Sequence, residues 1–255
     1  MPELELGIQL LLVAAGFIAG FVSSIAGAGG MIALPALLWA GVPPLEALGT
    51  NKFQSVFGTL SSTINFFSKG HLQLRWLLPG ICAAILGSVV GVWLVQRLDA
   101  DFLSWLLPVL LIVISLYFLM SPRVSDLDSR ARMGRLPFNL LVGGGLGFYG
   151  GFFGPGMGSF FALAFVALLG FNMRAATAHT KPLVLATNTT AMLIFVAGGH
   201  IVWSLALGMS VAQALGARLG SNMVITRGAA LVKPVLVGAS LLIAIRLLLE
   251  QGGLL

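Results

Sequence analysis

Long apolar stretches separate the charged residues of this chain, and their lengths predict membrane-spanning helices. No charged residue lies between Glu5 and Glu46. Because a helix crosses the hydrocarbon core of a bilayer with about 20 residues, this stretch can cross twice, or cross once and re-enter. The glycines of "SSIAGAGGMIALP" interrupt it in the middle. Further apolar runs cover approximately 53–68, 76–96, 102–120, 137–153, 157–171, 182–198, 202–225 and 229–249.

The amino-acid composition identifies lipid as the solvent for most of the chain. Hydrophobic residues make up 58% of the sequence and charged residues 9%, with a mean hydropathy of +1.02. A soluble domain carries roughly 25% charged residues, because even a compact particle of this size needs a large wetted surface. The opening "MPELELGIQLLL" lacks the basic residues of a signal peptide and predicts a retained first span. The sequence therefore predicts an all-α polytopic membrane protein.

Residues that recur at a constant spacing predict an internal duplication. Gly16, Gly20, Gly27 and Gly29 match Gly143, Gly147, Gly154 and Gly156, 127 positions later. At a spacing of 129 positions, Gly41, Ala47, Lys52, Gly70, His71, Gly87 and Gly91 match Gly170, Ala176, Lys181, Gly199, His200, Gly216 and Gly220. Internal repeats are a common way to build transporters. We therefore expect an N-terminal transmembrane repeat over residues 1–120, a linker over 121–136 and a C-terminal transmembrane repeat over 137–255.

The distribution of basic residues predicts that the two repeats are inverted. If each half crosses the membrane five times, the halves have opposite orientations, and the loops on one side hold most of the lysines and arginines. Four crossings per half would divide these residues evenly. Because cytoplasmic loops carry the excess of Lys and Arg, we expect five crossings, a cytoplasmic linker and both termini outside. Topology then explains the net charge of +6, and no nucleic-acid partner is expected.

Two glycine-rich segments at equivalent positions are the first candidate binding elements. The residues concerned are Gly27, Ala28, Gly29 and Gly30 in the first half, and Gly154, Gly156, Met157 and Gly158 in the second. A break of this kind exposes backbone N–H groups at the start of the next helical piece, and that end attracts anions. Paired breaks in related halves indicate a site near the middle of the membrane. The alternative is that the glycines only permit a tight turn or a close helix crossing.

The segments "GTNKFQ" and "AHTKPL" place a lysine at equivalent positions of the two halves. We expect Lys52 and Lys181 at the start of a span, with Thr50 or Thr180 as a helix cap and Pro182 in the first turn. Lys52 and Lys181 are candidates to guard the two entrances of a central anion path, one from each side, and Thr50, Asn51 and Thr180 are candidate binding residues beside them. The alternative is a pair of lysines that extend to the membrane surface. His179 is either a hydrogen-bond donor to the anion or an interfacial histidine without a special role.

Polar residues inside the following spans are weaker candidates. Asn188 belongs to "ATNTTA", and a comparable run, "SSTIN", follows Lys52 in the first half. Such residues either hold helices together or line a polar passage. Arg218 lies within the apolar run 202–225. A charged side chain inside the membrane costs free energy and usually has a function. We interpret Arg218 as a substrate or gating residue, with a position near the inner surface as the alternative.

The acidic residues restrict the chemistry. All of them occupy the termini or the predicted loops, so no carboxylate is expected inside a span. The sequence contains no HExxH, CxxC, Walker A or GxSxG motif, and we expect no enzyme activity and no metal or other cofactor. Moving one charge through 100 mV is worth about 2.3 kcal/mol. An anion therefore leaves a negative cytoplasm without a coupling ion, and this pattern favours anion export.

The chain resembles the TauE/SafE family of sulfite exporters over about residues 8–249. The resemblance is carried by "SSIAGAGGMIALPALLWAGVPPLEALGTNKFQSVFGTLSST" and "GGLGFYGGFFGPGMGSFFALAFVALLGFNMRAATAHTKP". It implies a bacterial or archaeal membrane permease for sulfite, thiosulfate, sulfoacetate or related organosulfur anions, often an exporter. In this chain "GPGMG" replaces the glycine run usual in the second half, and "AHTKP" replaces the usual Thr-Asn or Thr-Ser, as in a variant subgroup.

The sequence thus predicts a permease in the plasma or inner membrane that moves a small anion, a sulfur oxyanion or an organosulfonate, outward under the membrane potential. The expected partners are the anion and the lipid bilayer, and the sequence leaves open whether the chain forms a homodimer. Two alternatives stay open at this stage: a channel-like facilitator of another small solute, and a non-transporting membrane scaffold.

Overall fold

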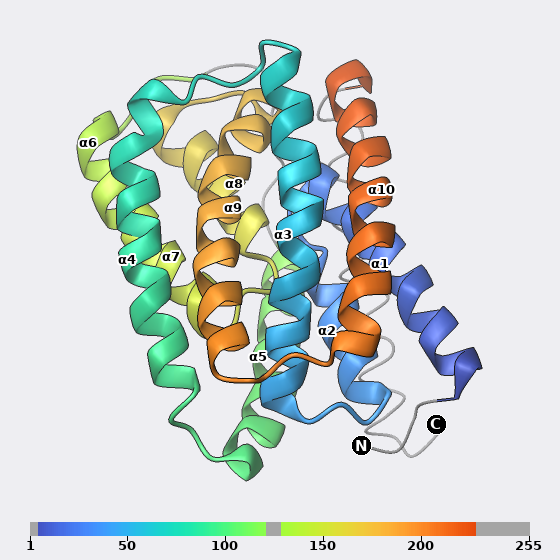
Figure 1. Cartoon of the computed structure of the whole chain (residues 1–255). Coiled ribbons are helices and arrows are strands. Elements are labelled where there is room, and N and C mark those ends of the chain that lie inside the picture. Colours follow the sequence, from blue (N-terminus) through green and yellow to red (C-terminus); the bar gives the residue numbers. More distant parts are fainter. Residues whose placement is uncertain (1–4, 121–128, 228–255) are drawn as a thin grey trace.

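The described part of the chain is helical and contains no strand. The computed structural model describes residues 5–120 and 129–227, and it confirms the predicted all-α class (Figure 1). Within these residues, four helices are long and apolar enough to cross a membrane: Leu6–Ala26, Arg75–Val95, Ala100–Tyr117 and Met173–Ala197. The predicted run 229–249 and the first half of the linker, residues 121–128, lie outside the described residues.

The helices follow the same order in both halves, namely a broken first helix and then long single helices. The first half contains α1 (Leu6–Ala26), α2 (Gly30–Trp39), α3 (Pro44–Ser68), α4 (Leu78–Val95, after a 3-10 turn over Arg75–Leu77) and α5 (Ala100–Met120). The second contains α6 (Arg135–Pro137), a π-helical turn (Phe138–Val142), α7 (Gly143–Phe152), α8 (Met157–Leu169), α9 (Met173–Ala197) and α10 (Trp203–Arg227).

Both glycine-rich segments are breaks between helices. Helix α1 ends at Gly27, which has a φ of 77°. Helix α8 begins after Gly156, which also has a φ of 77°, and Gly154 has a φ of 98°. These left-handed conformations strain any residue with a Cβ and are routine for glycine. The chain can therefore turn inside the protein at both positions.

The repeated glycines pack each broken helix against the fourth helix of the other half. A Cβ on Gly20 of α1 would lie 2.1 Å from the carbonyl oxygen of Gln213 in α10. At the equivalent position in the second half, a Cβ on Gly147 of α7 would lie 2.5 Å from the Ala84 backbone in α4. Small residues let membrane helices approach this closely. The spacing of 127 positions found in the sequence therefore corresponds to equivalent, crossed contacts.

The Gly20 contact can be tested with alanine substitutions on one helix. Gly20→Ala should lower the thermal unfolding midpoint of the detergent-solubilised protein, because overpacking of this kind costs about 1–3 kcal/mol. Gly7→Ala is the matched control, since nothing lies within 4 Å of a Cβ there. Fluorescence-detected size exclusion after heating measures both. Equal midpoints for the two variants would contradict the close crossing of α1 and α10.

The two central helices, α3 and α9, lie side by side and run in opposite directions (Figure 1). At one end, the imidazole of His179 in α9 accepts a hydrogen bond from the backbone N–H of Gln73, which follows α3. At the other end, His200, just after α9, lies 3.7 Å from Glu46 in the first turn of α3. Opposite directions for equivalent helices are what inverted repeats require. Inversion and the position of the termini relative to the membrane stay predictions.

The starts of α3 and α9 differ from the sequence prediction. Helix α9 begins at Met173, with the side chain of Asn172 accepting a hydrogen bond from the Ala175 amide at 2.9 Å. Helix α3 begins at Pro44. Lys52 and Lys181 therefore lie about two turns inside these helices, and the prediction that they begin a span is wrong.

The predicted caps are wrong for the same reason. The hydroxyl of Thr180 donates to the Ala176 carbonyl one turn earlier in α9. The hydroxyl of Thr50 accepts a hydrogen bond from the Val202 amide, before α10. Pro182 lies inside α9 rather than in its first turn. The sequence suggests a start here because a proline and several polar residues interrupt an apolar region, whereas these residues face the protein interior.

Candidate functional site

The two breaks meet at the centre of the described structure. A Cβ on Gly27 would lie 2.3 Å from the backbone carbon of Gly158, and a Cβ on Gly30 would lie 3.2 Å from the Cα of Pro155. The hydroxyl of Ser159, in the first turn of α8, donates to the Ala26 carbonyl at the end of α1. Backbone from one half is therefore in direct contact with backbone from the other half.

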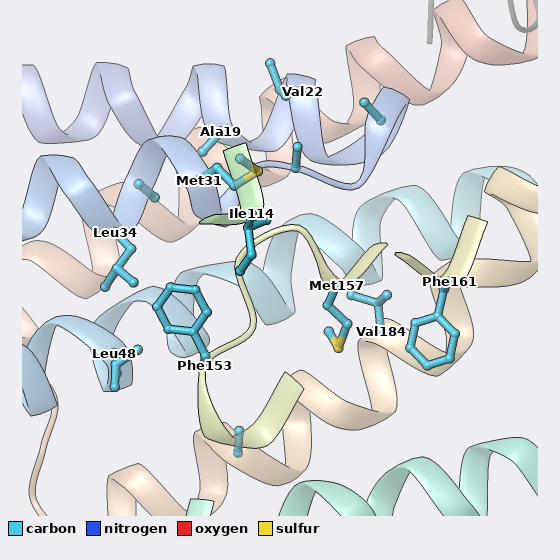
Figure 2. Packing of buried hydrophobic residues seen from close by; sticks show 14 of the residues in the cluster. Ala19, Val22, Met31, Leu34, Leu48, Ile114, Phe153, Met157, Phe161 and Val184 are labelled. Carbon is cyan, nitrogen blue, oxygen red and sulfur yellow. The ribbon is translucent and has the colours of Figure 1, made fainter. Parts of the chain in front are cut away.

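Apolar side chains surround this contact. Figure 2 shows Phe153 and Met157 at the two ends of the second break, and Met31 of α2 next to Ala19 of α1. Phe153 is fully buried and Met157 almost so. Because apolar surroundings screen charges weakly, any polar group among these side chains interacts strongly with its few partners.

Each lysine reaches across to the broken helix of the other half. The Lys181 ammonium donates a hydrogen bond of 2.8 Å to the carbonyl of Ser23, in the last turn of α1. The Lys52 ammonium donates to the carbonyl of Gly150, near the end of α7. Ser23 and Gly150 are themselves 127 positions apart. The two contacts are thus equivalent, and both lysines are only 2% exposed.

The helix ends explain why the lysines bind there. Carbonyls in the last turn of a helix carry partial negative charge, and the Ser23 carbonyl accepts from Lys181 in addition to the backbone N–H of Gly27. A Cβ on Gly154 would lie 1.9 Å from the Lys52 nitrogen, so this glycine leaves the space that the ammonium occupies. Lys52 therefore lies directly against the second break.

The lysines also have unused hydrogen-bonding capacity. An ammonium has three N–H donors, and each lysine makes one hydrogen bond to the rest of the described chain. Over residues 5–120 and 129–227, neither has a carboxylate partner. A buried charge without a counter-charge is costly, and both an anion and water would be favourable partners.

The structure brings only some of the other predicted residues to this centre. Ala28 is fully buried within the first break. The side-chain nitrogen of Asn51 lies 3.5 Å from the position that a Cβ on Gly30 would take, so Asn51 is next to the first break. Asn188 is buried on α9, about two turns beyond Lys181.

Four predicted residues lie elsewhere. Thr50 and Thr180 make the hydrogen bonds described above. Arg218 is exposed on α10, next to the exposed Leu219, and the structure does not bring it to the lysines. His179 faces a separate cavity at one end of the bundle.

Sequence reasoning missed the polar residues between α3 and α10. Gln54 and Gln213 are buried, and each has a side-chain oxygen without a partner in the described structure. Asn65 donates to Ser221 at 2.7 Å, which favours the prediction that the polar run after Lys52 holds helices together. The signal available for Gln54 and Gln213 was their position inside otherwise apolar runs.

The fold and this centre define a class of protein. Large apolar side chains are exposed along several helices, among them Leu86 at 68% and Val211 at 64%, as lipid contact requires. Two broken helices meet inside the bundle, which is a typical arrangement in membrane transporters, and two buried lysines lie beside them. The chain is a multi-pass membrane transporter.

Comparison with known proteins identifies the family. Residues 12–247 match the sequence profile of the family described as "Sulfite exporter TauE/SafE", and the chain belongs to this family. No solved structure matches the chain.

Bacterial relatives are similar over most of their length. A "Probable membrane transporter protein ORF9" of Sinorhizobium sp is 44% identical over 98% of this chain and 96% of its own length. YfcA of Escherichia coli (strain K12), with the same description, is 45% identical over 92% of this chain and 88% of its own length. A relative in Haemophilus influenzae is 42% identical over 98% of both chains. These proteins are described as transporters, not as enzymes.

Proposed function

We propose that the protein transports a small anion, a sulfur oxyanion or an organosulfonate, which binds between the two breaks beside Lys52 and Lys181. The observation that carries this proposal is the pair of buried ammonium groups, each without a carboxylate partner in the described structure. The family description as sulfite exporters supports a sulfur oxyanion. The substrate carries at least one negative charge and offers the oxygen acceptors that the ammonium donors lack.

The crossed lysine contacts give the site a way to open. An anion bound to the unused N–H donors of Lys181 neutralises the ammonium and weakens its hydrogen bond to the Ser23 carbonyl, and an anion at Lys52 does the same at Gly150. Each such event weakens one of the contacts that hold a broken helix to the other half. The breaks can then separate on one side of the bound anion while the equivalent contact keeps the other side closed. Such a sequence of steps is alternating access built on two equivalent halves.

The proposed direction is outward, with both termini outside the cell. A negative cytoplasm drives an anion out with about 2.3 kcal/mol per charge and 100 mV. In the described conformation, the contact between Gly27 and Gly158 closes the centre, which favours a carrier over the channel-like facilitator. The family and its relatives argue against the alternative of a non-transporting scaffold.

Flux into proteoliposomes tests the proposed function. Sulfite or a short organosulfonate should move with a rate that saturates with concentration, and the rate should rise when a potassium gradient makes the side containing the anion negative. Liposomes without protein are the control. A rate that stays proportional to concentration would assign a pore, and the absence of flux for all tested sulfur anions would refute the substrate class.

A further inference from the structure

A cavity of about 380 Å³ lies at one end of the bundle, away from the two breaks. It is formed where the loops before α4 and α9 meet the residues before α6, at the top of Figure 1. Its volume is within the range of small-molecule sites, roughly 300–1,000 Å³. It is far larger than a bare oxyanion needs.

Aromatic rings form one wall of the cavity. The Trp76 ring centroid lies 5.6 Å from that of His179 and 5.9 Å from that of Phe171. The rings of Phe171 and His179 are 5.2 Å apart and nearly perpendicular. Such faces bind flat apolar groups, because ring pairs gain energy beyond the area they bury.

Arg135 adds a positive charge beside this wall. Its guanidinium carbon lies 5.0 Å from the Trp76 ring centroid, and the side chain is exposed. The described residues give it no carboxylate partner. A guanidinium can stack on an aromatic face and still direct its N–H donors, in the guanidinium plane, at a carboxylate or sulfonate. The lining thus combines the accessible cation of Arg135 and the aromatic rings with the polar residues Gln73, Ser129 and Asn172.

His179 contributes the face of a neutral imidazole ring to the cavity, and no positive charge. Its Nδ1 lies 2.8 Å from the Ala175 carbonyl, which can only accept, so Nδ1 carries the proton. Its Nε2 accepts from the Gln73 amide at 3.4 Å. Both ring nitrogens are therefore used, and Arg135 supplies the positive charge of the cavity.

The position of His179 separates this cavity from the central site. Each residue of a helix is rotated by about 100° from the one before it, so residues two apart point to nearly opposite sides. Helix α9 therefore directs Lys181 toward the breaks and His179 toward the cavity. This spacing gives a structural reason for the His-Thr-Lys sequence in this segment.

We propose that this cavity is a second binding site, and that it takes an organic anion with a flat apolar body. Trp76, Phe171 and His179 hold the apolar body, and Arg135 binds the anionic group. Its role in transport, as a site that the substrate occupies before it reaches the breaks, rests on the proposed function. The binding of the organic anion in this cavity does not depend on the proposed function.

Equilibrium binding to the full chain in phosphatidylcholine nanodiscs tests this site. Isothermal titration with benzenesulfonate and with benzoate should show binding. Benzyl alcohol, which lacks the charge, should bind at least tenfold more weakly, and in the Lys181→Gln variant so should sulfite, which lacks the apolar body. Equal affinity for benzyl alcohol, or for sulfite in that variant, would overturn the proposed chemistry.

Substitutions locate the binding. Arg135→Gln and Trp76→Leu should each weaken benzenesulfonate binding at least tenfold. Arg132→Gln is the matched control, because Arg132 is exposed in the same segment and does not line the cavity. Should Trp76→Leu fail to fold, Arg135→Gln alone decides, since its side chain is exposed. Unchanged binding in Arg135→Gln, or an equal loss in Arg132→Gln, would overturn the site.

Two further measurements distinguish binding in this cavity from binding at the central lysines and from occupation by a lipid headgroup. Lys181→Gln should keep the benzenesulfonate affinity of the unsubstituted protein, so a failure of the central site does not affect this result. Loss of binding in Lys181→Gln would overturn a separate cavity site. Binding should also persist when phosphatidylglycerol replaces half of the lipid, whereas displacement by this lipid would assign the cavity to a headgroup and overturn the proposal.

Discussion

Lys52→Gln and Lys181→Gln are each expected to lower anion flux about 10- to 100-fold. Hydrogen bonds to charged groups contribute about 1.5–3 kcal/mol, and 1.4 kcal/mol is a factor of ten. Glutamine keeps an N–H donor that can reach the Ser23 or Gly150 carbonyl, so the crossed contact with the broken helix is retained in part. The charge that attracts the anion is lost. Initial rates in proteoliposomes, normalised to the amount of folded protein, measure the effect.

Lys69→Gln is the matched control for these two variants. Lys69 lies just after α3, where its exposed ammonium donates to the Asn222 side chain at 3.0 Å. It should transport at the rate of the unsubstituted protein. Because an unpaired buried charge is costly, the thermal midpoints of Lys52→Gln and Lys181→Gln should not fall. Full flux in both central variants would refute the anion site, and equal losses in all three variants would show a non-specific charge effect.

Gly158→Ala is expected to destabilise the protein and to slow transport, although it lies in a helix. Alanine is about 1 kcal/mol more favourable than glycine in a helix interior. At this position, however, the new Cβ would lie 2.6 Å from the Cα of Gly27. The contact is with backbone, which cannot rotate away, so the two breaks must move apart at a cost of about 1–3 kcal/mol.

Gly145→Ala is the matched control on another helix, and it should not lower the thermal midpoint. Gly145 lies in α7, and nothing lies within 4 Å of a Cβ there. Its thermal midpoint should stay equal or rise, because only helix propensity changes. Unfolding followed by size exclusion and flux in proteoliposomes give the two readouts. A rise in midpoint for Gly158→Ala would show that the breaks are not in contact in the folded protein.

Much of the architecture could be predicted because membrane helices leave a strong signal in one dimension. The lengths of the apolar runs located most helices, and the breaks at Gly27 and Gly156 were visible as glycines within apolar stretches. The helix starts were predicted less well. Residues 44–52 and 173–181 contain polar side chains that resemble a loop, but most of these side chains are buried against other helices.

The site could be predicted only in part. The sequence identified both lysines as a pair, since they recur at equivalent positions. It could not indicate their partners, because Ser23 and Gly150 offer backbone carbonyls, and every residue has one. It also could not show that Arg135 and Trp76 stand near His179, since these residues come from separate segments that meet only in the fold.

The sequence by itself determined that the protein is helical, spans a membrane, belongs to a transporter family and carries two lysines and two glycine-rich breaks at recurring spacings. These properties follow from side-chain type and spacing, which the order of residues contains directly. Only the tertiary structure decided that each lysine binds the broken helix of the opposite half, that the two breaks touch, and that His179 faces a different cavity from Lys181. The reason is that contacts between distant segments depend on how whole helices cross, and a crossing is fixed by the packing of many small residues together.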